Sequence, residues 1–146
     1  MNEGSTKLRL HGPVYLATSA ISCWKCRKQT PVHSLCATDV EDFEPDEEPW
    51  CVEAETFVFE VPPDALPRQV EAALAGVAPN FKPTFSRTVG ESSWANVCVH
   101  CQMLQGAFFL HQEPDGPFFC NPEDFDGKMT LISEETFDIE GASYSM

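Results

Sequence analysis

The sequence predicts a single α+β domain, in which a mainly antiparallel sheet carries one or two short helices. Several short apolar stretches end at Pro or Gly and predict strands, whereas residues 64–78 have the spacing of a helix. Two Cys-x-x-Cys pairs, far apart in the chain, are placed to join an early segment to a late one. Because 146 residues suit one hydrophobic core, we expect residues 1–146 to form one domain.

The first two predicted strands flank the first cysteine pair. Residues 14–22 predict a strand that enters Cys23-Trp-Lys-Cys26, and residues 30–40 predict a strand that leaves it. A strand, a Cys-x-x-Cys turn and a second strand form a hairpin whose tip presents two thiols. We call such a turn a knuckle.

An acidic, proline-containing stretch follows at residues 41–49. It has almost nothing to bury, so we expect a mobile loop there. Residues 50–61 then predict a strand that ends at a pair of prolines. The two-residue period of a strand places Phe57, Phe59 and Val61 on one face.

Residues 64–78 give the strongest helix prediction. Asp64 can cap its N-terminus, and Pro67 falls in the first turn, where a missing N–H is harmless. Pro79 closes the segment. The apolar residues at helical spacing are Leu66, Val70, Ala73, Leu74 and Val77.

Residues 84–89 and 93–99 predict a hairpin that feeds the second pair, Cys98-Val-His-Cys101. Residues 102–112 predict a short second helix, although Gly106 is a poor helix former. The apolar set of that helix is Met103, Leu104, Ala107, Phe108 and Leu110.

The C-terminal part offers fewer signals. Residues 114–117 predict a turn, after which Phe118 and Phe119 are expected to anchor a loop in the core. Residues 129–132 predict a last strand. We expect a frayed tail over residues 141–146.

Cys23, Cys26, Cys98 and Cys101 are the candidate metal ligands. Two Cys-x-x-Cys pairs match a tetrahedral four-thiolate Zn²⁺ site, which is structural because it leaves no open position for a substrate. The first residues contain no apolar signal core, so the sequence predicts a reducing, cytoplasmic compartment. The odd count of seven cysteines also disfavours a fully paired disulfide framework. Iron in the same four-cysteine site, or a redox dithiol at the first pair, are the alternatives.

The two knuckles resemble the zinc-ribbon, or rubredoxin-like, class. Residues 85–106, in which Trp94-Ala-Asn leads into the second pair, also resemble a pattern in bacterial zinc-binding proteins of unassigned function. Most zinc-ribbon knuckles place Gly after the second Cys, where a positive φ suits the turn, whereas this chain has Arg27 and Gln102 there. The resemblance implies a fold and a ligand set but no activity.

Other candidate groups have plainer interpretations. We expect Cys36, Cys51 and Cys120 to be buried small side chains. His33 and Cys36 lie close enough to the first knuckle to serve as a substitute ligand or to contact the ligands, and His100 is expected to point outward. His111, Asp115 and Cys120 contain the residue types of a cysteine nucleophile site, and Asp124, Asp126 and Gly127 have a faint likeness to a calcium loop. No spacing supports either assignment.

The charge is unevenly distributed. A net charge of −14 argues against a general nucleic-acid binder and favours a basic partner. Residues 39–48 contain seven acids and no base, beside Trp50, whereas Lys25, Arg27 and Lys28 lie on the first knuckle. A cation there can offset the charge of a thiolate centre. Trp24, Trp50 and Trp94 are candidate surface anchors, although Trp94 is expected in the core. No stretch is long and apolar enough to span a membrane.

Three functions remain open from the sequence. The first is a non-catalytic protein-binding module with a structural zinc, an adaptor or an inhibitor or immunity protein that acts on a basic protein. The second is an enzyme with a site near His111 or Cys120 that the sequence does not reveal. The third is a nucleic-acid accessory zinc ribbon that uses Lys25, Arg27 and Lys28. No feature of the sequence indicates the oligomeric state.

Overall fold

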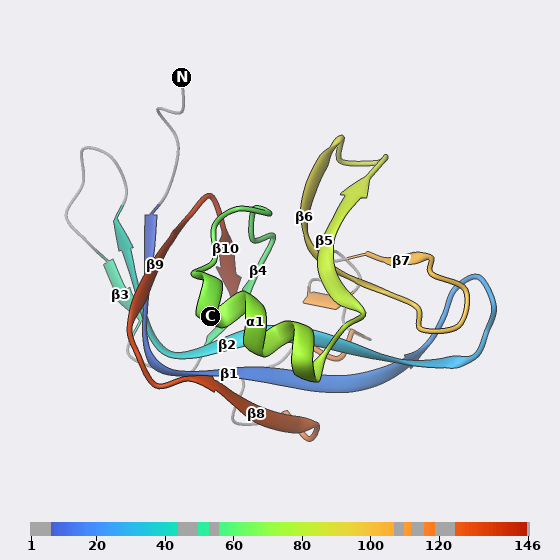
Figure 1. The fold of residues 1–146 in the computed structure, drawn as a ribbon, viewed down its shortest axis with the longest axis horizontal. Coiled ribbons are helices and arrows are strands. Elements are labelled where there is room, and N and C mark those ends of the chain that lie inside the picture. The colour runs from blue at the N-terminus through green and yellow to red at the C-terminus, as the bar shows by residue number, and fades with distance from the viewer. Residues whose placement is uncertain are drawn as a thin grey trace.

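The computed structural model describes residues 7–43, 50–52, 56–106, 110–111, 116–118 and 125–145. Its strands pair antiparallel throughout, in two sheets, and a helix packs beside them (Figure 1). This arrangement confirms the predicted class of a mainly antiparallel sheet with helix. The elements are β1 Lys7–Ser22, β2 Gln29–Phe43, β3 Trp50–Val52, β4 Thr56–Phe59, α1 Arg68–Val77, β5 Phe81–Ser86, β6 Glu91–Val97, β7 Leu104–Gln105, β8 Lys128–Ser133, β9 Phe137–Glu140 and β10 Ser143–Ser145.

A long hairpin of β1 and β2 is the backbone of the larger sheet. It runs from the pair Lys7↔Phe43 to the pair Ser22↔Gln29, with a register shift between His11 and Val14. Both strands exceed the predicted ranges. Residues 41–43 belong to β2, so the expected acidic loop over 41–49 was wrong there, and residues 44–49 lie outside the described ranges.

The remaining strands flank this hairpin. The larger sheet has the order β10-β4-β2-β1-β8, with β3 also paired to β2 and β9 to β1. The smaller sheet has the order β5-β6-β7. The two are joined where the Trp94 N–H donates to the carbonyl oxygen of Val61 at 2.8 Å.

Two hydrophobic clusters cover opposite faces of the larger sheet. Successive residues of one strand point to opposite faces and so belong to different clusters. Val58 and Leu35 belong to the first cluster, whereas their neighbours Phe57 and Cys36 belong to the second. Helix α1 contributes Val70 and Leu74 to the first cluster. The second contains Ala17, Val32, Cys36, Phe57, Leu110 and Phe118.

The predicted strand over residues 50–61 is divided into β3 and β4, and residues 53–55 lie outside the described ranges. Phe57 and Phe59 share a face as predicted, because both rings contact His111. Val61 does not share it and packs in the first cluster. The backbone of Glu60 has a φ of 56°, which breaks the alternation between Phe59 and Val61.

The helix begins later than predicted. Pro67, not Asp64, is the N-cap residue, and no side chain bonds to the first turn. The helical region is disfavoured for a residue that precedes proline, which accounts for a non-helical Leu66 and a helix that starts at Arg68. Val70 and Leu74 are buried as expected, whereas Val77 in the last turn is 51% exposed.

The segment after the second cysteine pair contradicts the predicted helix over residues 102–112. Leu104 and Gln105 form β7 and pair with Val97 and Asn96. Leu110 and His111 are helical, and residues 107–109 and 112 lie outside the described ranges. The pairing with β6 therefore overrides the apolar spacing on which the helix prediction depended.

The C-terminal segment is also more ordered than predicted. The expected strand over 129–132 is confirmed as β8, but no sequence pattern indicated β9 and β10. The tail over 141–146 is not frayed up to residue 145, because β10 pairs with β4 and the Tyr144 hydroxyl donates to Asp42 Oδ2 at 2.9 Å. Phe118 is buried as predicted, and Phe119 and the first half of the turn over 114–117 lie outside the described residues. Within the ranges that the structure describes, no helix could span a membrane.

Candidate metal centre

The first knuckle is the tip of the β1–β2 hairpin. The Cys23 N–H donates to the carbonyl oxygen of Lys28 at 2.9 Å, and the Arg27 N–H donates to that of Cys23 at 3.0 Å. The Lys25 N–H points at Cys23 Sγ, 3.3 Å away. Arg27 closes the turn with a φ of 68°. The chain thus turns around the first sulfur and supplies it with a backbone donor.

The second knuckle follows β6 and repeats this geometry. The Cys98 N–H donates to the carbonyl oxygen of Met103 at 2.9 Å, and the Gln102 N–H donates to that of Cys98 at 2.9 Å. The His100 N–H lies 3.3 Å from Cys98 Sγ. Gln102 has a φ of 66°, so both knuckles take a positive φ after their second cysteine, the position that Gly occupies in most zinc ribbons.

The structure brings the four predicted cysteines together. Their sulfurs all lie within 4.8 Å of one another. Cys23 and Cys101 are 3.6 Å apart at Sγ, and Cys26 and Cys98 are also 3.6 Å apart. A tetrahedral centre with metal–sulfur distances of about 2.3 Å has edges of about 3.8 Å between sulfurs. None of the four is in a disulfide, so the cluster has the donors and spacing to hold one metal ion.

Burial and hydrogen bonds set the acidity of these thiols. Burial raises the pKa of Cys23, but hydrogen bonds from backbone N–H groups, Cys101 and Gln105 outweigh it and lower that pKa to about 6. The pKa of Cys98 is lowered by a similar balance. For Cys101, the backbone bond at Met103 lowers the pKa, but burial and the neighbouring sulfurs raise it to about 11. The four thiols therefore cannot all ionise easily together, and a bound cation would supply the missing stabilisation.

Gln105 is a contact of the centre that the sequence did not reveal. Its side chain is buried and donates from Nε2 to Cys23 Sγ at 3.4 Å and to the Met103 carbonyl oxygen at 2.8 Å. The β7 strand thus carries a donor from the second knuckle to a sulfur of the first. Only the pairing of β7 with β6 places it there, and the sequence predicted a helix at this point.

A buried polar network holds the strands that lead to the knuckles. His33 Nε2 lies 3.0 Å from Asn80 Oδ1, and Thr18 Oγ1 lies 2.9 Å from His33 Nδ1. Asn96 accepts from the His33 N–H and donates to the His33 carbonyl oxygen. His33 therefore joins β2 to β6 and is not a ligand. Burial lowers its pKa, so it stays neutral. Cys36 packs in the second cluster, as expected of a buried small side chain.

Each knuckle also reaches across to the other. Trp24 Nε1 donates to the Leu104 carbonyl oxygen at 2.8 Å, and His100 Nε2 lies 3.0 Å from the Gln29 carbonyl oxygen. His100 is exposed, as predicted. These two contacts fix the relative position of the knuckles independently of any metal.

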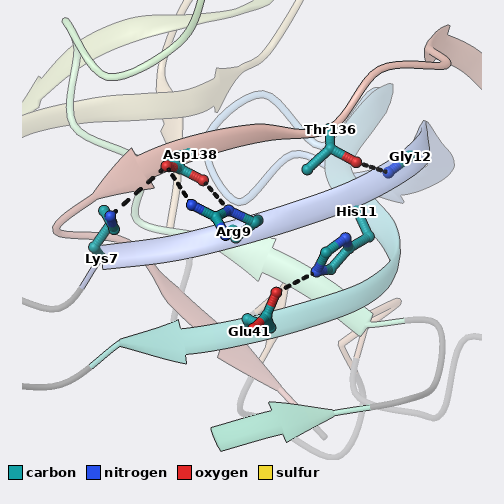
Figure 2. A network of polar contacts seen from close by, with 7 residues as sticks. All are labelled: Lys7, Arg9, His11, Gly12, Glu41, Thr136 and Asp138. Atoms are coloured by element: carbon teal, nitrogen blue, oxygen red, sulfur yellow. Dashed lines mark hydrogen bonds and ion pairs between the residues drawn. The ribbon is translucent and has the colours of Figure 1, made fainter. Parts of the chain in front are cut away.

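The acidic segment 39–48 proves to be partly used within the fold. Glu41 lies 2.6 Å from His11 on the neighbouring strand (Figure 2), and Asp42 is buried beneath Tyr144. The same charged face carries Arg9, whose guanidinium donates to Asp138 at 2.8 Å and lowers the pKa of that carboxyl. The side chain of Trp50 and residues 44–48 are outside the described parts, so their predicted binding role stays a prediction.

His111 lines a small cavity between the two sheets. Its ring stacks on Phe59, with centroids 4.1 Å apart, and Nδ1 is buried without a hydrogen-bond partner among the described residues. Burial lowers the pKa of His111 to about 3. Asp115 and Cys120, its partners in the hypothetical nucleophile site, lie outside the described residues, as do Asp124 and the side chain of Cys51. Asp126 is exposed.

Trp94 is buried, as predicted, and contacts Phe81, whereas Trp24 is 57% exposed. Trp24 is thus the described tryptophan that can anchor a partner. The chain matches no protein-family model, no curated protein and no solved structure. Its fold and its four-cysteine centre are therefore the observations from which function must be argued.

Proposed function

We propose that the chain is a non-catalytic protein-binding module whose fold is held by a structural Zn²⁺ at Cys23, Cys26, Cys98 and Cys101. The observation that carries this proposal is the set of four sulfurs, all within 4.8 Å of one another. A metal with four protein thiolates has no position for a substrate or an activated water, so the centre serves structure rather than chemistry.

Zinc is the metal that best fits this role. It prefers four tetrahedral sulfur ligands and has no redox chemistry, whereas iron in the same ligand set would make an electron carrier. The centre joins the tip of β1–β2 to the end of β6, segments separated by more than 70 residues. Binding would therefore contribute directly to the free energy of folding.

The partner that we propose for the acidic body is a basic protein. The net charge of −14 would attract such a partner and raise its association rate, with an effect that weakens as salt increases. An adaptor, or an inhibitor that neutralises a basic protein, is the role that fits a module with this charge and a closed metal centre.

Affinity capture tests this function. The zinc-loaded chain should retain a basic protein from the native cell, and the association rate with the purified partner should fall as salt rises. Neutralising Glu44, Asp46, Glu47 and Glu48 together tests the acidic segment separately, and Asp42 is left unchanged because it accepts a hydrogen bond from Tyr144 within the fold. Capture of nucleic acid alone, or of nothing, would contradict the proposal.

One observation favours an enzyme as a second candidate. His111 has a ring nitrogen that bonds to no described residue, beside a cavity that His33, Ser34 and Gln105 also line. The Ser34 hydroxyl, however, has its single proton directed to backbone carbonyl oxygens, Leu35 at 3.1 Å and Val58 at 3.4 Å, rather than to a histidine among the described residues. This candidate would be preferred only if the chain had a measurable enzymatic activity that His111→Phe abolished.

A further inference from the structure

We propose that the exposed surface of the two knuckles, residues 24–29 and 99–103, is a docking site for a short acidic segment of a partner protein that carries apolar side chains. We call this surface the knuckle face. The proposal rests on the proposed function of a protein-binding module and gives it a second surface, opposite in charge to the acidic body.

Hydrogen bonds already position the side chains of the knuckle face in the free chain. Trp24 is 57% exposed, yet its indole is fixed by the bond from Nε1 to the Leu104 carbonyl oxygen at 2.8 Å. His100 makes the reciprocal contact with the Gln29 carbonyl oxygen. An exposed aromatic ring that is already held in place loses little conformational entropy on binding, which favours affinity.

Three exposed apolar side chains lie on this face. Val99 is 43% exposed and Met103 is 37% exposed, and both belong to the second knuckle, whereas Trp24 belongs to the first. The four-cysteine cluster and the bond to Leu104 place the two knuckles side by side. An exposed Trp with adaptable aliphatic neighbours is the composition of a protein-binding surface rather than of a solvated turn.

The charge of the face is opposite to that of the molecule. Lys25, Arg27 and Lys28 are exposed, and none of them forms an ion pair with any residue that the structure describes. No Asp or Glu occurs in residues 14–38 or 92–106, the two described segments that build this end. By contrast, Lys7 and Arg9 at the other end of β1 are both paired with Asp138.

These three bases do not serve the sulfurs directly. The donors to sulfur include the backbone N–H groups of Lys25, His100 and Met103 and the side chain of Gln105, and none of these is the side chain of a base. A divalent metal with four thiolates carries a formal charge of about −2, which the bases offset in part from a distance. Their side chains remain exposed and available to a carboxylate partner.

A short acidic peptide fits this face better than a nucleic acid does. At physiological salt, charges farther away than about 8 Å are largely screened, so a short segment experiences the bases and not the acidic body. A nucleic acid carries phosphates along its whole length and would extend from the face onto a surface of net charge −14. Val99 and Met103 also offer contacts suited to apolar side chains.

Selection from a random dodecapeptide library displayed on phage, with the zinc-loaded chain as bait, tests the proposal. Enriched peptides should combine Asp or Glu with Leu, Phe or other apolar residues. For the synthetic consensus peptide, we expect Lys25→Glu/Arg27→Glu/Lys28→Glu and Trp24→Ser each to weaken binding at least about tenfold. Zinc content and thermal melts identify a variant that has failed to fold. If Trp24→Ser does not fold, the triple charge variant alone decides the test.

The matched control is Arg68→Glu/Lys82→Glu/Arg87→Glu, which reverses three exposed bases outside the knuckles and changes the net charge equally. It should change the affinity less than about twofold. The proposal is overturned if no peptide is enriched, if the consensus is neutral or basic, if the control loses as much as the knuckle variant, or if oligo-dT binds the face more tightly than the peptide. If the peptide test fails but the chain still captures a basic protein, the knuckle-face proposal is overturned and the proposed function is not.

Discussion

The two knuckles have nearly the same backbone but different surroundings. Each places a backbone N–H 3.3 Å from its first sulfur, and each has a positive φ after its second cysteine. The first knuckle is the tip of a long hairpin and carries three bases. The second follows a short strand and carries Val99 and Met103, with Gln105 behind it. The comparison teaches that the six-residue turn of each knuckle, 23–28 or 98–103, determines the geometry of its two cysteines. The surrounding residues determine which surface each knuckle presents.

The largest expected effect comes from removing one ligand from either knuckle. Cys23→Ser and Cys98→Ser should destabilise the chain equally, by several kcal/mol, because one shared metal is lost in both and structural zinc binds small domains with about 10 kcal/mol or more. Chemical denaturation with metal analysis measures the two losses. Cys120→Ser is the control, with a much smaller effect. Unequal losses at the two knuckles, or an equal loss at Cys120, would mean that the ligands are misassigned.

Acidification should weaken the core beside the second knuckle. The pKa of His111 is lowered to about 3 in the folded chain, from an ordinary value of 6.5. Between these two pH values the unfolded chain therefore binds a proton at His111 and the folded chain does not. Stability should therefore fall below about pH 6 by up to about 1.4 kcal/mol per pH unit from this residue alone. His111→Phe should remove that part of the slope. Unfolding measured from pH 7 to pH 5 in both chains gives the difference, and parallel curves would show that His111 does not titrate in this way.

A smaller effect tests the donor that passes from one knuckle to the other. Gln105→Met keeps the size of a buried side chain but removes the hydrogen bond to Cys23 Sγ. Loss of such an outer contact lowers metal affinity about tenfold or more. Competition with a chelator measures it. Gln29→Met, at an exposed glutamine of the first knuckle, should leave the affinity unchanged, and an equal loss there would deny Gln105 a special role.

The smallest effect should be a gain at the turn positions. Arg27 and Gln102 have a positive φ of 68° and 66°, which costs a residue with a side chain about 1 kcal/mol. Replacement by Gly, as in Arg27→Gly or Gln102→Gly, removes this cost, but the greater freedom of Gly in the unfolded chain cancels part of the gain. We expect each to stabilise the chain by about 0.5 kcal/mol in thermal melts. Lys28→Gly, where no positive φ occurs, should destabilise it. A loss at Arg27 or Gln102 would show that their side chains contribute more than the turn requires.

Much of the metal centre could be predicted from the sequence, because the ligands lie in two short, regular motifs. The strands beside the first knuckle and the hairpin before the second were also evident from alternation and turn residues. The contacts of the centre were not. Gln105 acts through strand β7, which forms only because β6 is available to pair, and the local apolar spacing favoured a helix.

The errors at the other end have similar causes. The late start of α1 follows from the effect of Pro67 on Leu66, which outweighed Asp64 as a cap. Strand β10 is stabilised by β4, nearly 90 residues earlier, and by the bond from Tyr144 to Asp42. Long-range pairing of this kind leaves no local pattern in a tail that is rich in small and polar residues.

Zinc K-edge X-ray absorption on protein purified without added metal tests the central claim most directly, namely that the two knuckles share one four-thiolate zinc. We predict an edge that corresponds to one zinc per chain and a first shell of four sulfurs at about 2.3 Å, without nitrogen or oxygen. A protein without zinc, or a first shell that contains nitrogen or oxygen in place of any cysteine sulfur, would contradict the claim.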